Sequence, residues 1–76
     1  MSRLTIISAR EMVNLLMKLG FIKVRQRGSH MFFSHPDGRC TTVPDHPGED
    51  LSRGLIRKIL QDIEITPEEY ERLRNQ

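Results

Sequence analysis

The fold is decided by the stretch FIKVRQRGSHMFFSH at residues 21–35. Its first half alternates apolar and basic side chains, which is the two-residue period of a half-buried β-strand. Gly28-Ser29 interrupts the alternation, and a two-residue loop that begins with glycine is typical of a tight hairpin. The returning strand runs from His30 to His35. The stretch therefore predicts two antiparallel strands joined at Gly28-Ser29.

The two-residue loop also predicts which side chains share a face, because residues directly opposite each other in a hairpin point the same way. The predicted pairs are Arg27 with His30, Arg25 with Phe32, and Lys23 with Ser34. One face then carries three cations, an imidazole and an aromatic ring, from Lys23, Arg25, Arg27, His30 and Phe32. The core face is expected to hold Ile22, Val24, Met31 and Phe33.

A helix is predicted before the hairpin and a third strand after it. Ser8 and Glu11 form a capping box, and the apolar spacing that follows predicts a helix over residues 9–19. Gly20 is suited to the left-handed residue that ends such a helix. After a turn at residues 35–39, a short strand is expected over residues 40–43.

Two more helices are predicted in the second half of the chain. Ser52 is placed to cap a helix with an apolar stripe from Leu55 to Ile63. The sequence Thr66-Pro67-Glu68-Glu69 is a second capping box, with proline at the first helical position. The whole order predicts an α+β fold, in which helices cover one face of a three-stranded antiparallel sheet and leave the other open.

Composition limits the class of protein. The 76 residues allow one domain, and no run of about 18 apolar residues is present to span a membrane. The N-terminus is too short and too polar for a signal peptide, and the single cysteine excludes an internal disulfide. These features favour a cytoplasmic protein. Residues 1–40 carry seven Lys or Arg and two acids, whereas residues 41–76 carry five and eight, so the basic half favours a nucleic-acid partner.

The predicted open face is suited to RNA. Lys23, Arg25 and Arg27 match phosphates, and the ring of Phe32 offers a base a surface for stacking. The cations beside His30 favour a neutral imidazole, the form that acts as a general base. The alternative interpretation is an ordinary solvated strand whose charges serve solubility.

The remaining candidate residues give weaker signals. His35 flanks a turn, and His46 lies in a loop rich in proline and glycine. Together with Cys40 they lack the spacing of a zinc site, so no metal and no cofactor are expected. A helix-turn-helix DNA-binding protein is disfavoured, because no partner helix precedes the second helix across a tight turn.

Five segments together resemble one known family, the HicA (YcfA-like) toxins of toxin–antitoxin modules. They are Leu19-Gly20-Phe21, Arg27-Gly28-Ser29-His30, Pro36-Asp37-Gly38-Arg39, Thr42-Val43-Pro44-Asp45-His46, and DLSRGLIRKIL at residues 50–60. The five segments occur in the family's order, and the resemblance covers about residues 8–65. We therefore expect a single domain of residues 1–76 whose family-like core is about residues 8–65. Residues 66–76 are a helical extension beyond that core.

The resemblance implies a fold like that of double-stranded-RNA-binding domains and an endoribonuclease that cleaves mRNA. It places the toxin in a type II toxin–antitoxin system, where a HicB-type antitoxin inhibits it. The family's catalytic histidine corresponds to His30, with Gly28 and Ser29 completing its motif, and His46 matches a recurrent position. An acidic antitoxin surface that covers the basic open face would block access of RNA to His30.

The implied chemistry needs neither a metal nor a cofactor. RNA supplies its own nucleophile in the 2′-hydroxyl, so a histidine that removes its proton and arginines that stabilise the phosphate charge are sufficient. His46 or water is the candidate acid for the leaving oxygen. The alternative is a non-catalytic RNA-binding module on the same fold, because fold alone does not define function.

Overall fold

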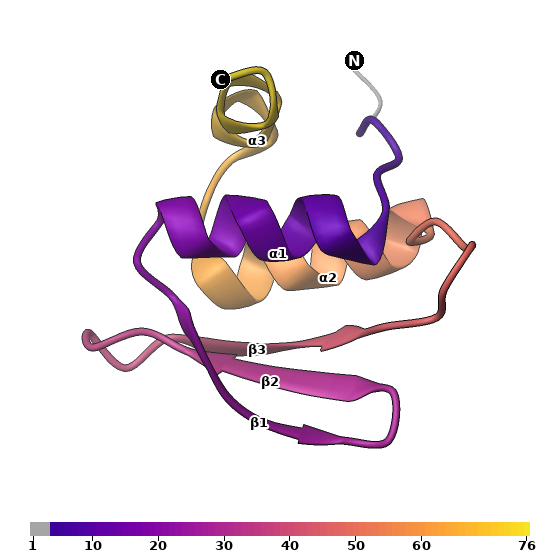
Figure 1. Ribbon diagram of the computed structural model, residues 1–76. Coiled ribbons are helices and arrows are strands. Elements are labelled where there is room, and N and C mark those ends of the chain that lie inside the picture. Colours follow the sequence, from indigo (N-terminus) through magenta and orange to yellow (C-terminus); the bar gives the residue numbers. More distant parts are fainter. Residues whose placement is uncertain (1–3) are drawn as a thin grey trace.

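The computed structural model describes residues 4–76, which form three helices and a three-stranded sheet (Figure 1). The elements are α1 (Ala9–Lys18), β1 (Ile22–Arg27), β2 (His30–Ser34), β3 (Cys40–Pro44), α2 (Arg53–Ile63) and α3 (Pro67–Arg74). The predicted α+β order is confirmed, including the short helix at the C-terminal end. None of these helices is both long and apolar enough to cross a bilayer.

The elements are arranged in layers. The sheet is antiparallel in the order β1-β2-β3, and α1 and α2 lie side by side over one of its faces (Figure 1). The third helix, α3, lies on the far side of α1 and α2 from the sheet. The other face of the sheet is therefore left open, as predicted.

The predicted caps hold the ends of α1. The backbone N–H of Glu11 donates to Ser8 Oγ (3.2 Å), and the N–H of Ser8 donates to Glu11 Oε1 (3.0 Å). These bonds satisfy two of the backbone donors that a helix leaves free at its start. Gly20 has φ of +97°, the left-handed conformation that turns the chain out of the helix toward β1.

N-cap side chains also start the other two helices, and at α3 they form a full capping box. Ser52 Oγ accepts from the N–H of Leu55 (3.2 Å) at the start of α2. At the start of α3, Thr66 Oγ1 accepts from the N–H of Glu69 (3.1 Å), and the Glu69 carboxylate accepts from the N–H of Thr66 (3.0 Å). Both helix starts are therefore confirmed where the sequence predicts them.

The core lies between the sheet and the two large helices. Met31 and Phe33 of β2 are buried, as predicted, and Val43 joins them from β3. The helices contribute Met12, Leu15, Leu16, Ile56, Ile59, Leu60 and Ile63. Phe21, which precedes β1, is also buried, at 1% exposure. Burial of one such side chain contributes about 1.5–3 kcal/mol to stability.

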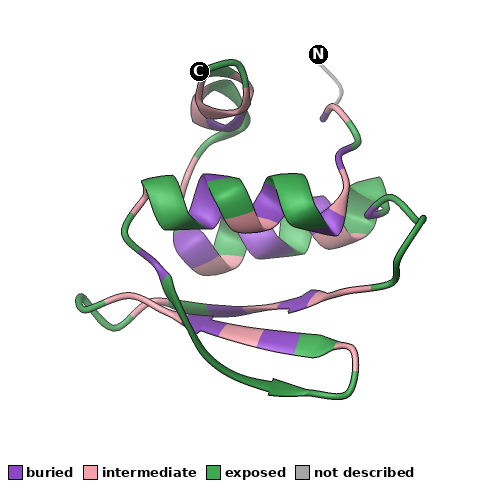
Figure 2. Ribbon diagram, viewed as in Figure 1, coloured by how far each residue is buried: buried purple, intermediate pink, exposed green. Residues whose placement is uncertain are grey.

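The prediction that Ile22 and Val24 belong to the core is wrong. Both are more than half exposed, at 59% and 55%, and Figure 2 shows β1 exposed along its whole length. Two features cause this. The helices make their main contacts with the sheet on β3, so β1 extends beyond their cover. A β-bulge between Lys23 and Arg25 also leaves Val24 without a partner.

The helix α3 and the segment before α1 hold each other in place. The Tyr70 hydroxyl donates to the backbone oxygen of Thr5, and the ring of Tyr70 is fully buried. The Glu71 carboxylate accepts from the N–H (3.0 Å) and the hydroxyl (3.1 Å) of Thr5. Burial alone would raise the pKa of Glu71, but the bonds from Thr5 and Arg74 lower it below the ordinary value of 4.5. Glu71 therefore accepts these bonds as a carboxylate.

Candidate functional site

The open face of the sheet is organised as three rows that run across the strands. The rows are Arg27–His30–Pro44, Arg25–Phe32–Thr42 and Ile22–Ser34–Cys40. Two residues separate one row from the next along β2, so at about 3.4 Å per residue the rows are about 6.8 Å apart. The side chains of β2 and β3 on this face are exposed or half-buried, whereas those on the other face are buried. Each row therefore presents its side chains to solvent.

His30 lies at the hairpin end of the face. Gly28 takes φ of +60° in the two-residue turn, and this turn places Arg27 directly opposite His30. The N–H of Asp45 donates to the backbone oxygen of Ser29 (2.6 Å), which ties the turn to the end of β3. The imidazole is exposed and makes no hydrogen bond within residues 4–76. It is therefore free to contact a ligand.

Arg25 lies opposite Phe32 in the middle row, as predicted, and the two side chains stack. The guanidinium carbon of Arg25 lies 4.5 Å from the centre of the Phe32 ring. This distance is well within the range of a cation–π contact. The ring of Phe32 is half-buried rather than free, so the surface offered to a ligand is the guanidinium plane on top of it.

The prediction that Lys23 shares this face and lies opposite Ser34 is wrong. The bulge at Val24 shifts the register by one residue, so Lys23 lies opposite Phe33, and Ile22 lies opposite Ser34. A shift of one residue turns a side chain to the other face of a sheet. Lys23 Nζ accordingly donates to Gln26 Oε1 (3.0 Å), and Gln26 lies opposite the core residue Met31.

His46 lies at the same end of the sheet as His30. It follows Pro44, the β3 residue paired with His30, by two positions and is exposed. It lines a hollow of about 380 Å³ at the start of α1, together with Arg10. An imidazole and a guanidinium thus share one hollow with Asp45, whose N–H bonds to the hairpin turn.

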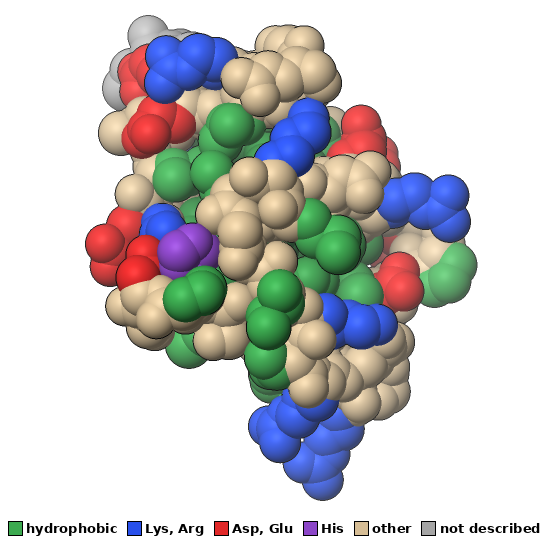
Figure 3. Space-filling view, turned by 60° about the vertical axis from the view of Figure 1, so that its left-hand side comes forward, with side chains coloured by type: hydrophobic (Ala, Val, Ile, Leu, Met, Phe, Trp, Pro, Cys, Tyr) green, Lys and Arg blue, Asp and Glu red, His purple; other side chains and the backbone are tan. Residues whose placement is uncertain are grey.

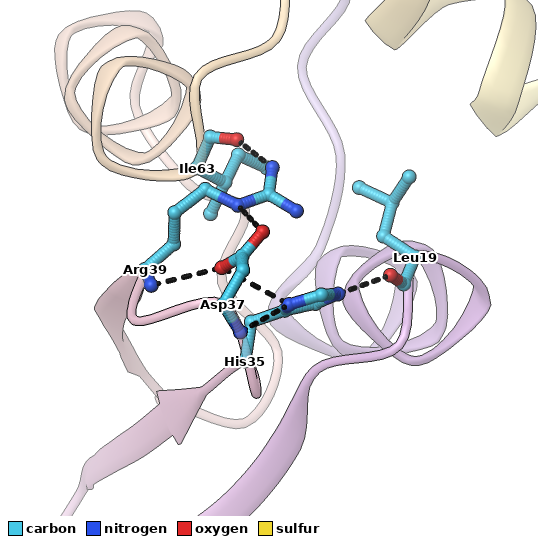
Figure 4. Close-up of polar contacts among 5 residues, drawn as sticks. All are labelled: Leu19, His35, Asp37, Arg39 and Ile63. Carbon is cyan, nitrogen blue, oxygen red and sulfur yellow. Dashed lines mark hydrogen bonds and ion pairs between the residues drawn. The ribbon is translucent and has the colours of Figure 1, made fainter.

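The third histidine, His35, has a structural role (Figure 4). Its Nε2 is 3.1 Å from the backbone oxygen of Leu19, and its Nδ1 accepts from the N–H of Asp37 (3.1 Å). Arg39 donates from Nε to Asp37 Oδ2 (2.8 Å) and from a terminal nitrogen to the backbone oxygen of Ile63 (2.5 Å). The turn between β2 and β3 is thereby tied to Leu19, which follows α1, and to the last residue of α2.

The charge of Asp37 depends on this turn. The hydrogen bond from the N–H of Arg39 lowers the pKa of Asp37 below 3.8, and the positive charge of Arg39 adds to that effect. The carboxylate is therefore ionised and neutralises Arg39. The cluster lies at the turn between β2 and β3, at the opposite end of β2 from His30, so it is not part of the site around His30. The cluster was not predicted from the sequence, although His35, Asp37 and Arg39 are spaced around a Pro-Gly turn.

Basic side chains gather where β1 lies. Figure 3 shows Lys and Arg crowded at the lower end of the molecule, the end that holds β1 in Figure 1. Acidic side chains lie mainly elsewhere on this view. Within residues 4–76, no group of three His, Cys, Asp or Glu side chains lies close enough to hold a metal ion, and Cys40 is an exposed free thiol.

Comparison with known proteins identifies the family. No curated protein matches the sequence. A family model described as the HicA toxin of bacterial toxin–antitoxin systems matches residues 9–65, which span α1 through the residue pair that follows α2 and include the three rows of the open face. The match covers most of the 76-residue chain, and α3 lies outside it. The chain therefore belongs to the HicA toxin family of bacterial toxin–antitoxin systems.

Proposed function

We propose that this protein is the toxin of a type II toxin–antitoxin system and an endoribonuclease that cleaves mRNA in the cytoplasm. The observation that carries the proposal is the exposed pair of Arg27 and His30, beside the stacked pair of Arg25 and Phe32. These residues put a proton acceptor, phosphate-binding cations and a stacking surface on one face. Membership of a toxin family supports an activity directed at a cellular target.

His30 acts as the general base in the proposed reaction. Its neutral imidazole takes the proton of a ribose 2′-hydroxyl, and the 2′-oxygen attacks the adjacent phosphorus. Arg25 and Arg27 stabilise the negative charge that grows on the phosphate oxygens. The bond to the 5′-oxygen breaks, and His46 or water gives that oxygen a proton. One positioned acid–base group accelerates such a step by about 10²–10⁴-fold.

The products follow from this sequence of bonds. One fragment ends in a 2′,3′-cyclic phosphate and the other begins with a 5′-hydroxyl, because the attacking oxygen belongs to the RNA itself. No metal or cofactor takes part in the scheme. A DNA strand of the same sequence has no 2′-hydroxyl, so it is bound but not cut.

A non-catalytic RNA-binding module is the second candidate, because the same cations and stacked pair bind RNA without cutting it. A cleavage assay with the purified chain separates the two. We expect a labelled single-stranded RNA to be cut in the presence of EDTA and the matched DNA to stay intact. Binding of both strands with no cleavage of the RNA would favour the module.

The proposed RNA contacts predict how binding depends on salt. The contacts are Arg25, Arg27, Phe32 and Ser29, the last in the turn beside His30. For single strands, the logarithm of the binding constant falls against the logarithm of the salt concentration with a slope of about −0.7 per phosphate contact. Replacing Arg25 or Arg27 by Gln should therefore flatten the slope by about 0.7 in fluorescence titrations.

Lys23 provides the matched control for this titration. It is a neighbouring cation on the same strand, but the bulge turns it to the other face. Lys23→Gln should leave the salt slope close to that of the wild type. A slope that falls equally in all three variants would show that RNA follows the whole basic end of the molecule rather than the open face.

A HicB-type antitoxin is the proposed protein partner. It would inhibit the toxin by covering the open face with an acidic surface, because the face carries Arg25 and Arg27 around His30. The stacked Arg25 and Phe32 are suited to anchor such an interface, since Arg and aromatic side chains dominate binding energy at interfaces. The acidic helix α3 lies on the far side of the molecule and stays outside the covered surface.

A further inference from the structure

The outer edge of β1 is unpaired. The sheet order is β1-β2-β3, so β1 pairs with β2 on one side and has no neighbouring strand on the other among residues 4–76. In an antiparallel pair, alternate residues point their N–H and C=O groups away from the partner strand. All residues of β1 are exposed, and Figures 1 and 2 show the strand at the border of the sheet. A row of backbone donors and acceptors is therefore open to a further strand.

The opposite edge of the sheet is less open. β3 ends in Pro44, which has no N–H to offer a neighbouring strand. Both large helices contact β3, and the hydroxyl of Thr41 donates to Asp62 Oδ2 of α2 (3.0 Å). A proline at the edge and a covering helix both hinder the addition of a strand. β1 has neither, so it is the edge suited to a further strand.

The cations of β1 select what can pair with it. Lys23, Arg25 and Arg27 make half of the strand basic, and no acidic residue lies within it. Two copies of β1 side by side would place like charges opposite each other, which destabilises a pair of strands. An acidic strand would place carboxylates opposite the same cations, which stabilises the pair. The charge therefore favours an acidic partner over a second copy of this chain.

Two exposed apolar side chains lie on the same strand. Ile22 and Val24 are both more than half exposed, and an added strand would shield them from water, which favours association. Along the open face the side chains of β1 follow the order Ile22, Arg25, Arg27. The segment that matches this face carries two acidic residues at alternate positions and an apolar residue beyond them.

We propose that the free edge of β1 docks an extended acidic segment of a protein partner, which joins the sheet as a fourth strand beside Arg25 and Arg27. Backbone hydrogen bonds supply affinity in this mode of recognition, and side chains supply specificity. The inference rests on the proposed function for the identity of the partner, an antitoxin, and adds how it docks. Neighbouring strands lie about 4.8 Å apart, so the carboxylates of the segment would neutralise the two arginines that the proposed RNA contacts require.

The test is nuclear magnetic resonance of the full chain with the blocked peptide Thr-Val-Thr-Glu-Thr-Glu-Thr-Val-Thr. Its sequence reads the same in both directions, so it matches β1 in a parallel or an antiparallel pairing. We expect chemical-shift changes in β1 and slower hydrogen exchange at alternate N–H groups of residues 22–27. The control is the same peptide N-methylated on its fourth and fifth residues, which keeps the charge but removes a donor from each side of the strand. It should bind about tenfold more weakly.

Variants of β1 test the charge contribution. Arg25→Gln and Arg27→Gln should each weaken binding of the unmodified peptide about two- to fivefold, the effect of one charged cross-strand pair. Lys23→Gln removes the same charge from the same strand, but the side chain of Lys23 is turned to the other face. Its affinity for the peptide should stay close to that of the wild type. An equal loss in all three variants would overturn the predicted pairing, because it would reflect net charge alone.

Other outcomes also decide the inference. Equal binding of the two peptides would overturn it, because strand addition requires the backbone donors. Absence of shifts in β1 at about 1 mM peptide, where even weak association is detected, would overturn it as well. The cleavage assay in EDTA tests the proposed function separately. Cleavage of RNA without docking of the peptide would overturn the edge site alone, and docking without cleavage would support the edge site and contradict the proposed function.

Discussion

Replacement of His30 by Gln should reduce kcat/KM for RNA cleavage by about 10²–10⁴-fold, the loss expected when a positioned proton acceptor is removed. Glutamine retains a polar side chain of similar reach, but it does not take up a proton near neutral pH. The measurement is the initial rate of cleavage of a labelled single-stranded RNA by the wild type and the variant, with the affinity for the uncut strand determined in parallel.

The fold should tolerate this substitution, because His30 is exposed and has no described hydrogen-bond partner among residues 4–76. The thermal midpoint of unfolding should therefore change little, and binding of the uncut strand should persist. A variant that cuts RNA at the wild-type rate would show that the general base lies elsewhere. His35→Gln is unsuitable as a control, because His35 bonds to the backbone of Leu19 and to Asp37.

Replacement of Tyr70 by Ala should lower the free energy of unfolding by about 3–5 kcal/mol, the cost of removing a buried aromatic side chain. Tyr70 is fully buried, and its hydroxyl reaches the backbone oxygen of Thr5. Burial raises the pKa of Tyr70 to about 12, so the hydroxyl keeps the proton that it donates. Urea titration at neutral pH measures the loss, which is large against the roughly 5–15 kcal/mol that stabilise a small domain.

Tyr70→Phe is the matched control for this measurement. It keeps the ring and removes only the hydrogen bond to Thr5, which should cost about 1 kcal/mol because the half-buried carbonyl of Thr5 loses its donor. Equal losses in both variants would assign the whole effect to the hydrogen bond. A stability for Tyr70→Ala that matches the wild type would show that α3 does not pack on α1 in solution.

Local chemistry made most of the fold predictable. Capping boxes at Ser8 and Thr66 mark helix starts without reference to the rest of the chain, and the Gly28-Ser29 turn fixes the pairing of Arg27 with His30. These signals involve residues within a few positions of each other. The two pairs nearest the turn, Arg27 with His30 and Arg25 with Phe32, were therefore predicted correctly. The register of a hairpin is fixed at the turn, so the pairs closest to it are the most certain.

The exposed position of Ile22 and the turned side chain of Lys23 were not predictable in this way. The alternation of apolar and basic residues in β1 is the same with or without a bulge at Val24, and only the sheet reveals the extra residue. Burial of β1 depends on where the helices pack, which is set by distant parts of the chain. The bond between Tyr70 and Thr5 joins residues 65 positions apart and likewise has no local signal.

The place of Thr42 on the open face, opposite Phe32, was also missed, although part of its signal was present. The alternation of Cys40, Thr42 and Pro44 against the buried Thr41 and Val43 would have placed Thr42 on the open face once β3 was paired with β2.

The ends of the cleaved RNA identify the nucleophile, which in the proposed reaction is the RNA's own 2′-hydroxyl with His30 as its base. A defined single-stranded RNA is incubated with the full chain in EDTA, and the fragments are analysed by mass spectrometry. We expect a 2′,3′-cyclic phosphate on one fragment and a 5′-hydroxyl on the other, with neither formed by His30→Gln. Fragments that carry a 3′-hydroxyl and a 5′-phosphate would contradict the proposed reaction, because they require water as the nucleophile.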